Sequence, residues 1–168
     1  MKLNKIDIYR LIIIMVISGI FGFIYETIFY RIDLGYFVKR GTTYGPWIPI
    51  YAFGGLFITL FTYKLKDKPI LVFTINTIVT SLLEYFTGYF LLKFKNIRLW
   101  DYNNEILNYG NINGFICLRS VLFFGLSSLF LIYLIIPFIK KIPDKLLSYL
   151  SIILGSLFLL DFILYRVI

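Results

Sequence analysis

Four ionisable residues lie within long apolar stretches of the sequence: Glu26, Glu84, Arg119 and Asp161. An ionised side chain at the centre of a membrane-spanning helix costs about 2.5–3.5 kcal/mol on insertion scales, so each charge needs a partner or a function. The sequence has no His and only one Cys, Cys117, which excludes imidazole chemistry, a thiolate cluster and an internal disulfide. Any chemistry must therefore come from carboxylates, Arg, Lys, hydroxyl groups and the backbone, and we expect no metal or other cofactor.

Three of these residues are expected at similar depths in the membrane. Counted along their apolar stretches at 1.5 Å per residue, Glu26, Glu84 and Arg119 lie roughly 6, 12 and 11 Å from one membrane face, if successive stretches alternate in direction. Small or polar residues recur at helical spacing beside both acids: Ser18 and Gly22 before Glu26, and Thr77, Ser81 and Gly88 around Glu84. Such stripes turn toward other helices in lipid, so both acids are expected to point into a bundle.

Two interpretations of this trio remain open. In the first, Arg119 forms a structural ion pair with one acid, and the other acid is protonated or hydrogen-bonded. In the second, the trio lines a polar pocket for a charged or polar ligand, which the surplus acid favours. Asp161 lies away from the small-residue stripe of its own stretch and close to Arg166, which indicates an interfacial acid that snorkels toward the headgroups.

The elements that must position these residues are membrane helices. Apolar residues make up 60% of the chain and charged residues 15%, too few to give a soluble domain its polar shell. A soluble enzyme and a nucleic-acid-binding domain are therefore excluded, and the net charge of +8 is expected at loop ends beside anionic lipid. We expect an all-α integral membrane protein forming one domain over residues 1–168, a bundle of about five transmembrane helices: 8–30, 47–63, 69–92, 112–139 and 147–168.

Two longer, motif-bearing loops, 31–46 and 93–111, fall on the same side of the membrane if all five spans cross. The first continues into an unusual segment: Arg40-Gly41-Thr42-Thr43-Tyr44-Gly45-Pro46-Trp47-Ile48-Pro49-Ile50-Tyr51. Its glycines permit positive φ and close backbone approach, and its prolines stiffen the start of the next span. The segment is either a re-entrant turn with an aromatic belt, or a gate or ligand loop in which Arg40 contacts an anion.

Several linked motifs form a pattern across about residues 10–135: Tyr25-Glu26, Arg40-Gly41, Tyr44-Gly45-Pro46, Pro49-Ile50-Tyr51, Glu84 with Gly88, Trp100-Asp101-Tyr102 and Asn113-Gly114. In this pattern the chain resembles the ABC-transporter type IV family of bacterial membrane proteins. Lys39 and Ala52 stand where that family usually has Asn and Gly. The resemblance implies a multi-pass permease or permease-like subunit of the inner (cytoplasmic) membrane, and it makes the residues of these motifs candidates for a site.

The leading hypothesis is a permease with a polar pocket formed by Glu26, Glu84 and Arg119 beneath the two loops, with Arg40 and Asp101 at its entrance. The sequence has no G-x-x-x-x-G-K-[ST] loop, so we expect any ATPase to be a separate chain, with a homo-oligomer as the other expected partner besides the lipid bilayer. One alternative is a membrane-embedded enzyme acting on a lipid-linked or amphipathic substrate, with a carboxylate base and Arg on a phosphate. The other is a non-catalytic assembly or sensory protein. The sequence names no substrate and no direction of transport.

Overall fold

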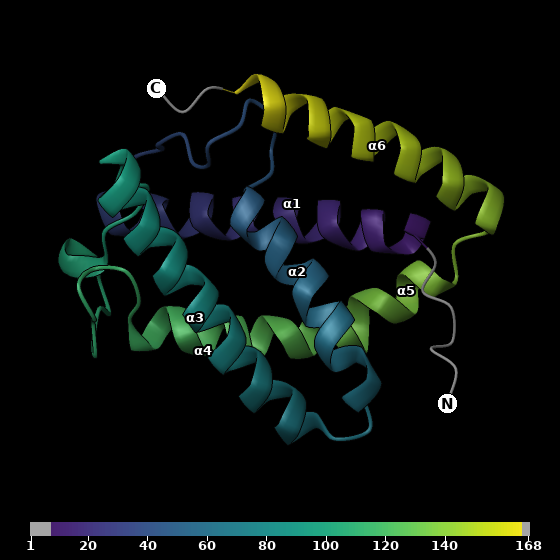
Figure 1. The fold of residues 1–168 in the computed structure, drawn as a ribbon, viewed down its shortest axis with the longest axis horizontal. Coiled ribbons are helices and arrows are strands. Elements are labelled where there is room, and N and C mark those ends of the chain that lie inside the picture. Colours follow the sequence, from purple (N-terminus) through teal and green to yellow (C-terminus); the bar gives the residue numbers. More distant parts are fainter. Residues whose placement is uncertain (1–7, 166–168) are drawn as a thin grey trace. The chain divides into compact units, whose positions relative to one another are not determined.

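The computed structural model describes residues 8–165, and the regular structure within them is helical apart from one isolated bridge between Ile112 and Ile116. The helices are α1 (Ile8–Leu34), α2 (Pro49–Thr62), α3 (Pro69–Lys95), α4 (Leu118–Phe130), α5 (Ile136–Lys140) and α6 (Asp144–Leu164) (Figure 1). Two short 3-10 turns, η1 (Tyr63–Leu65) and η2 (Tyr102–Asn104), and one π-helical turn, η3 (Leu131–Ile135), complete the list. The predicted all-α class is confirmed.

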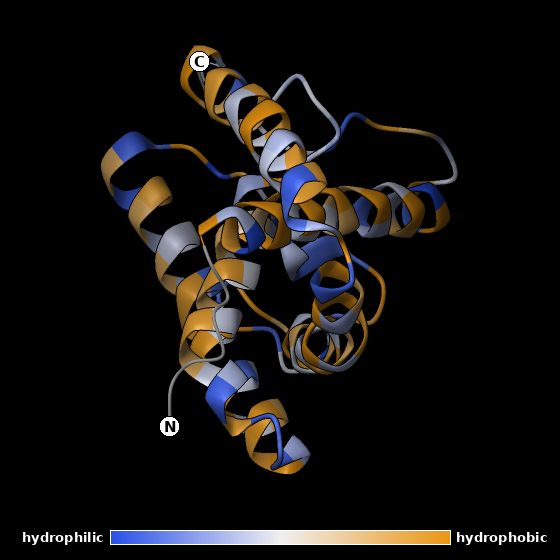
Figure 2. Ribbon diagram, turned by 90° about the vertical axis from the view of Figure 1, so that its right-hand side faces the viewer, coloured by the Kyte–Doolittle hydropathy of each residue, from blue (hydrophilic) through white to orange (hydrophobic). Residues whose placement is uncertain are grey.

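Four helices in the described part of the chain are long and apolar enough to cross a membrane. They are α1, α3, α6 and the continuous helix Leu118–Lys140, in which α4, η3 and α5 follow one another. Apolar residues dominate these helices in Figure 2. The second predicted span, 47–63, is different, because α2 has 14 residues and a length of only about 21 Å. The last three residues of the predicted span 147–168, among them Arg166, lie outside the described residues.

The chain divides into two compact units, and each is described by itself. The first unit comprises residues 1–64 and 131–168, with α1, α2, α5 and α6, and the second comprises residues 65–130, with α3 and α4. The expectation that residues 1–168 form one domain stays a prediction.

In the first unit, α2 begins near the middle of α1. The backbone N–H of Ile48 donates to the carbonyl of Gly19, 3.0 Å away, and Gly19 lies near the centre of the 27-residue α1. A β-carbon at Gly22 would come within 2.1 Å of the Tyr51 ring, so the two helices touch closely at this crossing. The segment between Leu34 and Ile48 therefore returns along α1 by about 15 residues, or roughly 22 Å.

From that crossing, α2 runs toward the start of α1. Arg10 pairs with Asp144 at 2.8 Å, which joins the starts of α1 and α6, and Figure 1 shows α6 alongside α1. Lys140, at the end of α5 and just before α6, donates to the hydroxyl of Tyr63, directly after α2. The returning loop and α2 together cover the length that one full helix would cover. The apolar segment 47–63 therefore gives a short helix, and four long helices remain in the described part of the chain.

In the second unit, α3 and α4 form an antiparallel hairpin. A β-carbon at Gly125 of α4 would meet the Thr77 hydroxyl and the Phe73 ring of α3, which fixes the register of the pair. The buried face of α3 repeats at every fourth residue: Val72, Asn76, Thr80, Glu84 and Gly88. Arg119 lies six residues before Gly125 on α4, and Glu84 lies seven residues after Thr77 on α3, so in an antiparallel pair the two charged residues lie close in height.

The predicted start of the fourth span at residue 112 is wrong, because α4 begins at Leu118. Residues 112–116 instead form a tight turn, in which Asn113 and Gly114 adopt positive φ values of 56° and 75° and the Ile112 N–H donates to the Ile116 carbonyl. Asn and Gly tolerate this left-handed conformation, which a helix cannot include. The whole segment 96–117 folds back against the last turns of α3.

Candidate functional site

Asp161 of α6 holds the loop that precedes α2. Its carboxylate accepts hydrogen bonds from the backbone N–H groups of Tyr44 (2.8 Å) and Gly45 (2.7 Å), and from the indole N–H of Trp47 (2.7 Å). Hydrogen bonds to a charged acceptor are stronger than neutral ones, and the buried carboxylate has three of them. The prediction that Asp161 snorkels at the interface is wrong, since the group is buried and bound to the protein.

The remaining motif residues around α2 shape the same loop. Gly41 has a φ of +82°, and a β-carbon there would lie 3.3 Å from the Trp47 carbonyl and 3.1 Å from the Ile48 side chain. Pro49 is buried in the first turn of α2, where its missing N–H costs nothing, whereas Pro46 is exposed. Together with Tyr51, which fills the space left by Gly22, these residues set where α2 starts.

Arg40 and Glu26 form an ion pair within the first unit. The Nη2 and Nε atoms of Arg40 both lie 2.9 Å from Glu26 Oε2, and both side chains are largely shielded from solvent. The guanidinium also lies over the Tyr30 ring, 3.7 Å from its centroid, a distance that favours a cation–π contact. The predicted anion contact of Arg40 is therefore made with a carboxylate of the protein itself.

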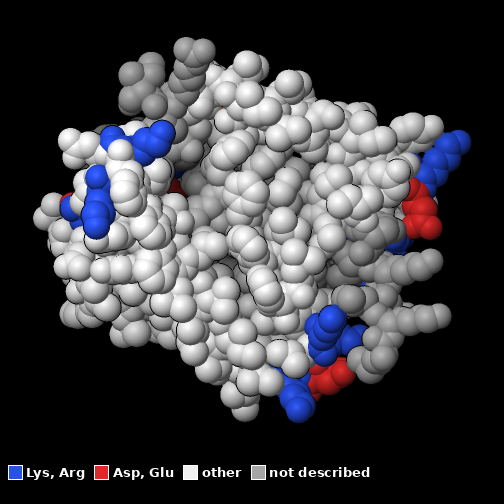
Figure 3. Space-filling view, viewed as in Figure 1, with Lys and Arg blue, Asp and Glu red and all other residues white. Residues whose placement is uncertain are grey.

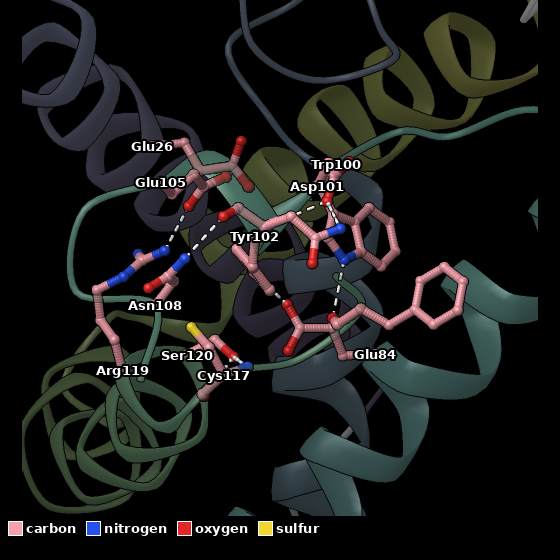
Figure 4. Close-up of polar contacts among 12 residues, drawn as sticks. Glu26, Glu84, Trp100, Asp101, Tyr102, Glu105, Asn108, Cys117, Arg119 and Ser120 are labelled. Atoms are coloured by element: carbon pink, nitrogen blue, oxygen red, sulfur yellow. Dashed lines mark hydrogen bonds and ion pairs between the residues drawn. The ribbon is translucent and has the colours of Figure 1, made fainter. Parts of the chain in front are cut away.

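The second unit gathers a buried polar cluster of Glu84, Tyr102, Glu105 and Arg119 (Figure 4). The Tyr102 hydroxyl donates to Glu84 Oε1 at 2.5 Å, and its ring lies 5.3 Å from the Arg119 guanidinium carbon. Arg119 Nη2 pairs with Glu105 Oε2 at 2.5 Å, and only 6% of the Glu105 side chain is exposed. Tyr102 thus touches both an acid of α3 and the cation at the start of α4.

The loop 96–117 supports this cluster with the predicted motif residues. Trp100 donates its indole N–H to the Phe115 carbonyl at 3.0 Å, and both rings pack where a β-carbon on Gly88 would clash. Asp101 accepts from the Asn103 N–H and pairs with Arg98 at 3.0 Å. These contacts fix the backbone on each side of Tyr102.

A second set of contacts closes the loop at Asn113 and Gly114. Arg98 donates to the Asn113 carbonyl at 2.7 Å, and the Tyr102 N–H donates to the Gly114 carbonyl at 3.0 Å. A β-carbon on Gly114 would lie 2.0 Å from Arg98 Nη2 and 2.3 Å from Asp101 Oδ1. The Asn-Gly pair is therefore part of the loop scaffold rather than of a helix.

Sequence reasoning located the buried acids but not all of their partners. Arg119 lies in the first turn of α4, not seven residues into a helix, and it keeps its depth because the preceding loop folds back along α3. The sequence analysis did not predict the ion pair of Arg119 with Glu105. The feature that could have indicated it is an acid in the motif-bearing loop, 14 positions before Arg119. The predicted pairing of Arg119 with Glu84 or Glu26 stays a prediction. No group of three or more His, Cys, Asp or Glu that could hold a metal ion occurs within residues 8–165.

The long apolar helices and their exposed apolar side chains define the class as an all-α membrane protein. On the face drawn in Figure 3, most of the surface carries no charge, as expected for a surface in contact with lipid tails. A family model described as "Putative ABC-transporter type IV" matches residues 13–165, nearly the whole chain, and the protein belongs to this family. No curated protein and no solved structure matches the chain.

Proposed function

We propose that this chain is a permease or permease-like subunit of the cytoplasmic membrane, and that its returning loop 35–48 lines the path of the transported solute. The observation that carries the proposal is the start of α2 beside Gly19, near the middle of α1. Non-helical backbone at membrane depth is tolerated only where protein or a water-filled cavity surrounds it. Transporters build their binding sites from such interrupted segments.

The buried charges support a path for a cation or a proton. Glu26 forms an ion pair with Arg40 in the first unit, and Arg119 forms one with Glu105 in the second. In the second unit, the buried Glu84 accepts a hydrogen bond from the hydroxyl of Tyr102. In this proposal Glu84 takes up the cation or proton, and Tyr102 links it to the charge of Arg119.

The energy for transport is proposed to come from a separate chain. The sequence lacks a phosphate-binding G-x-x-x-x-G-K-[ST] loop, and the family is described as an ABC-transporter family. We therefore expect an ATP-binding partner on the cytoplasmic side, and a homo-oligomer if five segments are too few to enclose a path.

Flux through purified protein tests the proposal. The full chain is reconstituted in liposomes that contain a pH-sensitive dye, and a potassium diffusion potential drives proton entry. We expect faster acidification than in protein-free vesicles and at least a tenfold loss in Glu84→Gln. Asp144→Asn should keep the wild-type rate, because Asp144 is exposed and lies at the start of α6, whereas the loop 35–48 contacts the end of α6.

A second experiment tests whether the chain is a subunit that transports solute only within a complex. The tagged chain is purified from native membranes, and the bound proteins are identified by mass spectrometry. Recovery of a stoichiometric chain with a Walker A loop supports the subunit form of the proposal. The absence of both proton flux and an ATP-binding partner would overturn it.

A further inference from the structure

We propose that Asp161 is the positioning residue of the returning loop 35–48, and that its carboxylate fixes the position of residues 41–48 relative to the terminal helix α6. This inference rests on the proposed function only in so far as that loop lines a transport path. The position of the loop should depend on the Asp161 carboxylate, and this dependence can be measured without a transport assay.

The loop has anchors on two different helices. On the α1 side, the Ile48 N–H donates to the Gly19 carbonyl at 3.0 Å. On the α6 side, Asp161 accepts from Tyr44, Gly45 and Trp47, at 2.7–2.8 Å in each case. Two consecutive backbone N–H groups directed at one anion form a nest, a local concentration of positive partial charge. A negative charge on α6 is therefore what this loop conformation requires.

The side chains around these hydrogen bonds are closely packed. The Trp47 ring meets Phe158, one turn before Asp161 on α6, in an edge-on contact with centroids 5.8 Å apart. A β-carbon on Gly45 would lie 2.5 Å from the Trp47 ring and 3.0 Å from Asp161 Oδ2. The absence of a side chain at position 45 lets the carboxylate reach the backbone.

The loop offers few internal replacements for these bonds. Thr43 Oγ1 donates to the Trp47 carbonyl at 2.6 Å, and the Trp47 N–H donates to the Gly45 carbonyl at 2.9 Å. The N–H groups of Tyr44 and Gly45 would need water in place of Asp161, and water is scarce at membrane depth. Loss of the carboxylate should therefore move residues 43–47 toward the aqueous side while the Ile48 anchor stays.

Accessibility at position 43 reports this movement. Thr43 is 1% exposed, and a cysteine has nearly the same size, so Thr43→Cys is the probe. The native Cys117 lies in the other unit and is also 1% exposed, which makes it an internal reporter of folding. Both thiols are labelled in intact protein with a membrane-impermeant maleimide and assigned by mass spectrometry.

We expect Asp161→Asn to raise the labelling rate at position 43 at least tenfold and to leave Cys117 protected. The amide removes the charge and points an N–H₂ group at N–H donors. Asp144→Asn is the matched control, because it makes the same change on the same helix at a residue that is 86% exposed. Equal labelling rates at position 43 in Asp161→Asn and Asp144→Asn would overturn the inference.

Chemical rescue separates positioning from general damage. In Asp161→Ala, formate at tens of millimolar should enter the vacated nest and slow labelling at position 43, whereas chloride at the same ionic strength should not. Labelling of both cysteines in both Asp161 variants, with no effect of formate, would show a structural collapse and would also overturn the inference. The expected labelling pattern without proton flux and without an ATP-binding partner would instead reject the proposed function alone.

Discussion

Gly22 of α1 lies so close to Tyr51 of α2 that a β-carbon at position 22 would come within 2.1 Å of the tyrosine ring. This contact, with the Ile48–Gly19 hydrogen bond beside it, sets the height at which α2 starts. The position of α2 thus depends on the absence of one side chain.

Gly22→Ala is expected to destabilise the first unit by about 1–3 kcal/mol, the usual range for overpacking a close contact. The measurement is thermal or denaturant unfolding of the purified protein in detergent. Gly54→Ala is the matched control in α2, since nothing lies within 4 Å of a β-carbon there, and alanine favours a helix over glycine by about 1 kcal/mol. Equal stability of the two variants would contradict the close contact.

Gly114→Ala should unfold the loop 96–117 more severely than Gly110→Ala. Both glycines have positive φ, which costs alanine roughly 1–2 kcal/mol. Only position 114 is crowded, with Arg98 and Asp101 within 2.3 Å of an added β-carbon. Faster maleimide labelling of the buried Cys117 in Gly114→Ala reports the loss, and similar labelling in both variants would show that backbone strain alone matters.

The buried ion pair between Arg119 and Glu105 should be costly to break from either side. Arg119→Ala and Glu105→Gln are each expected to lose about 3–5 kcal/mol of stability, because each leaves one buried charge without its partner. A variant carrying Arg119→Gln and Glu105→Gln should lose less than the sum of the single changes. Additive losses, measured by unfolding in detergent, would mean that the two side chains do not stabilise each other.

Glu84→Gln should harm function more than folding. The amide oxygen of Gln can still accept the hydrogen bond from Tyr102, so we expect a stability loss of about 1 kcal/mol or less. Arg119→Ala should therefore be the less stable variant of the two, and Glu84→Gln should lose proton flux while it stays folded. Unfolding and liposome flux measured on the same preparations check both halves of this prediction.

The short helix α2 is predicted to complete a membrane crossing together with the loop before it. Cysteines placed by Tyr36→Cys and Lys66→Cys in a Cys117→Ala background should react with an impermeant maleimide from opposite sides of sealed vesicles. If both sites react from the same side, α2 does not complete a membrane crossing.

The sequence alone determined the all-α class and the approximate positions of the long apolar helices. Long apolar stretches form helices in lipid, and the small residue Gly22 marks where α1 touches α2, whereas Gly88 marks where the loop 96–117 packs against α3. The buried acids Glu26 and Glu84 were recognisable because charge inside an apolar stretch is costly. The common level of Glu84 and Arg119 followed from helix geometry and holds in the hairpin of α3 and α4.

Only the tertiary structure decided what these charges contact. Asp161 meets the loop around Gly45 across 116 positions, and no local pattern encodes such a distance. Arg119 contacts Glu105 because the loop 96–117 folds back along α3. This fold of the loop depends on the left-handed turn at Asn113 and Gly114. Hydropathy measures how favourably a residue transfers into lipid. It carries no information on the hydrogen-bond partners of a polar loop inside the protein. Those bonds depend on packing between segments that are far apart in the chain.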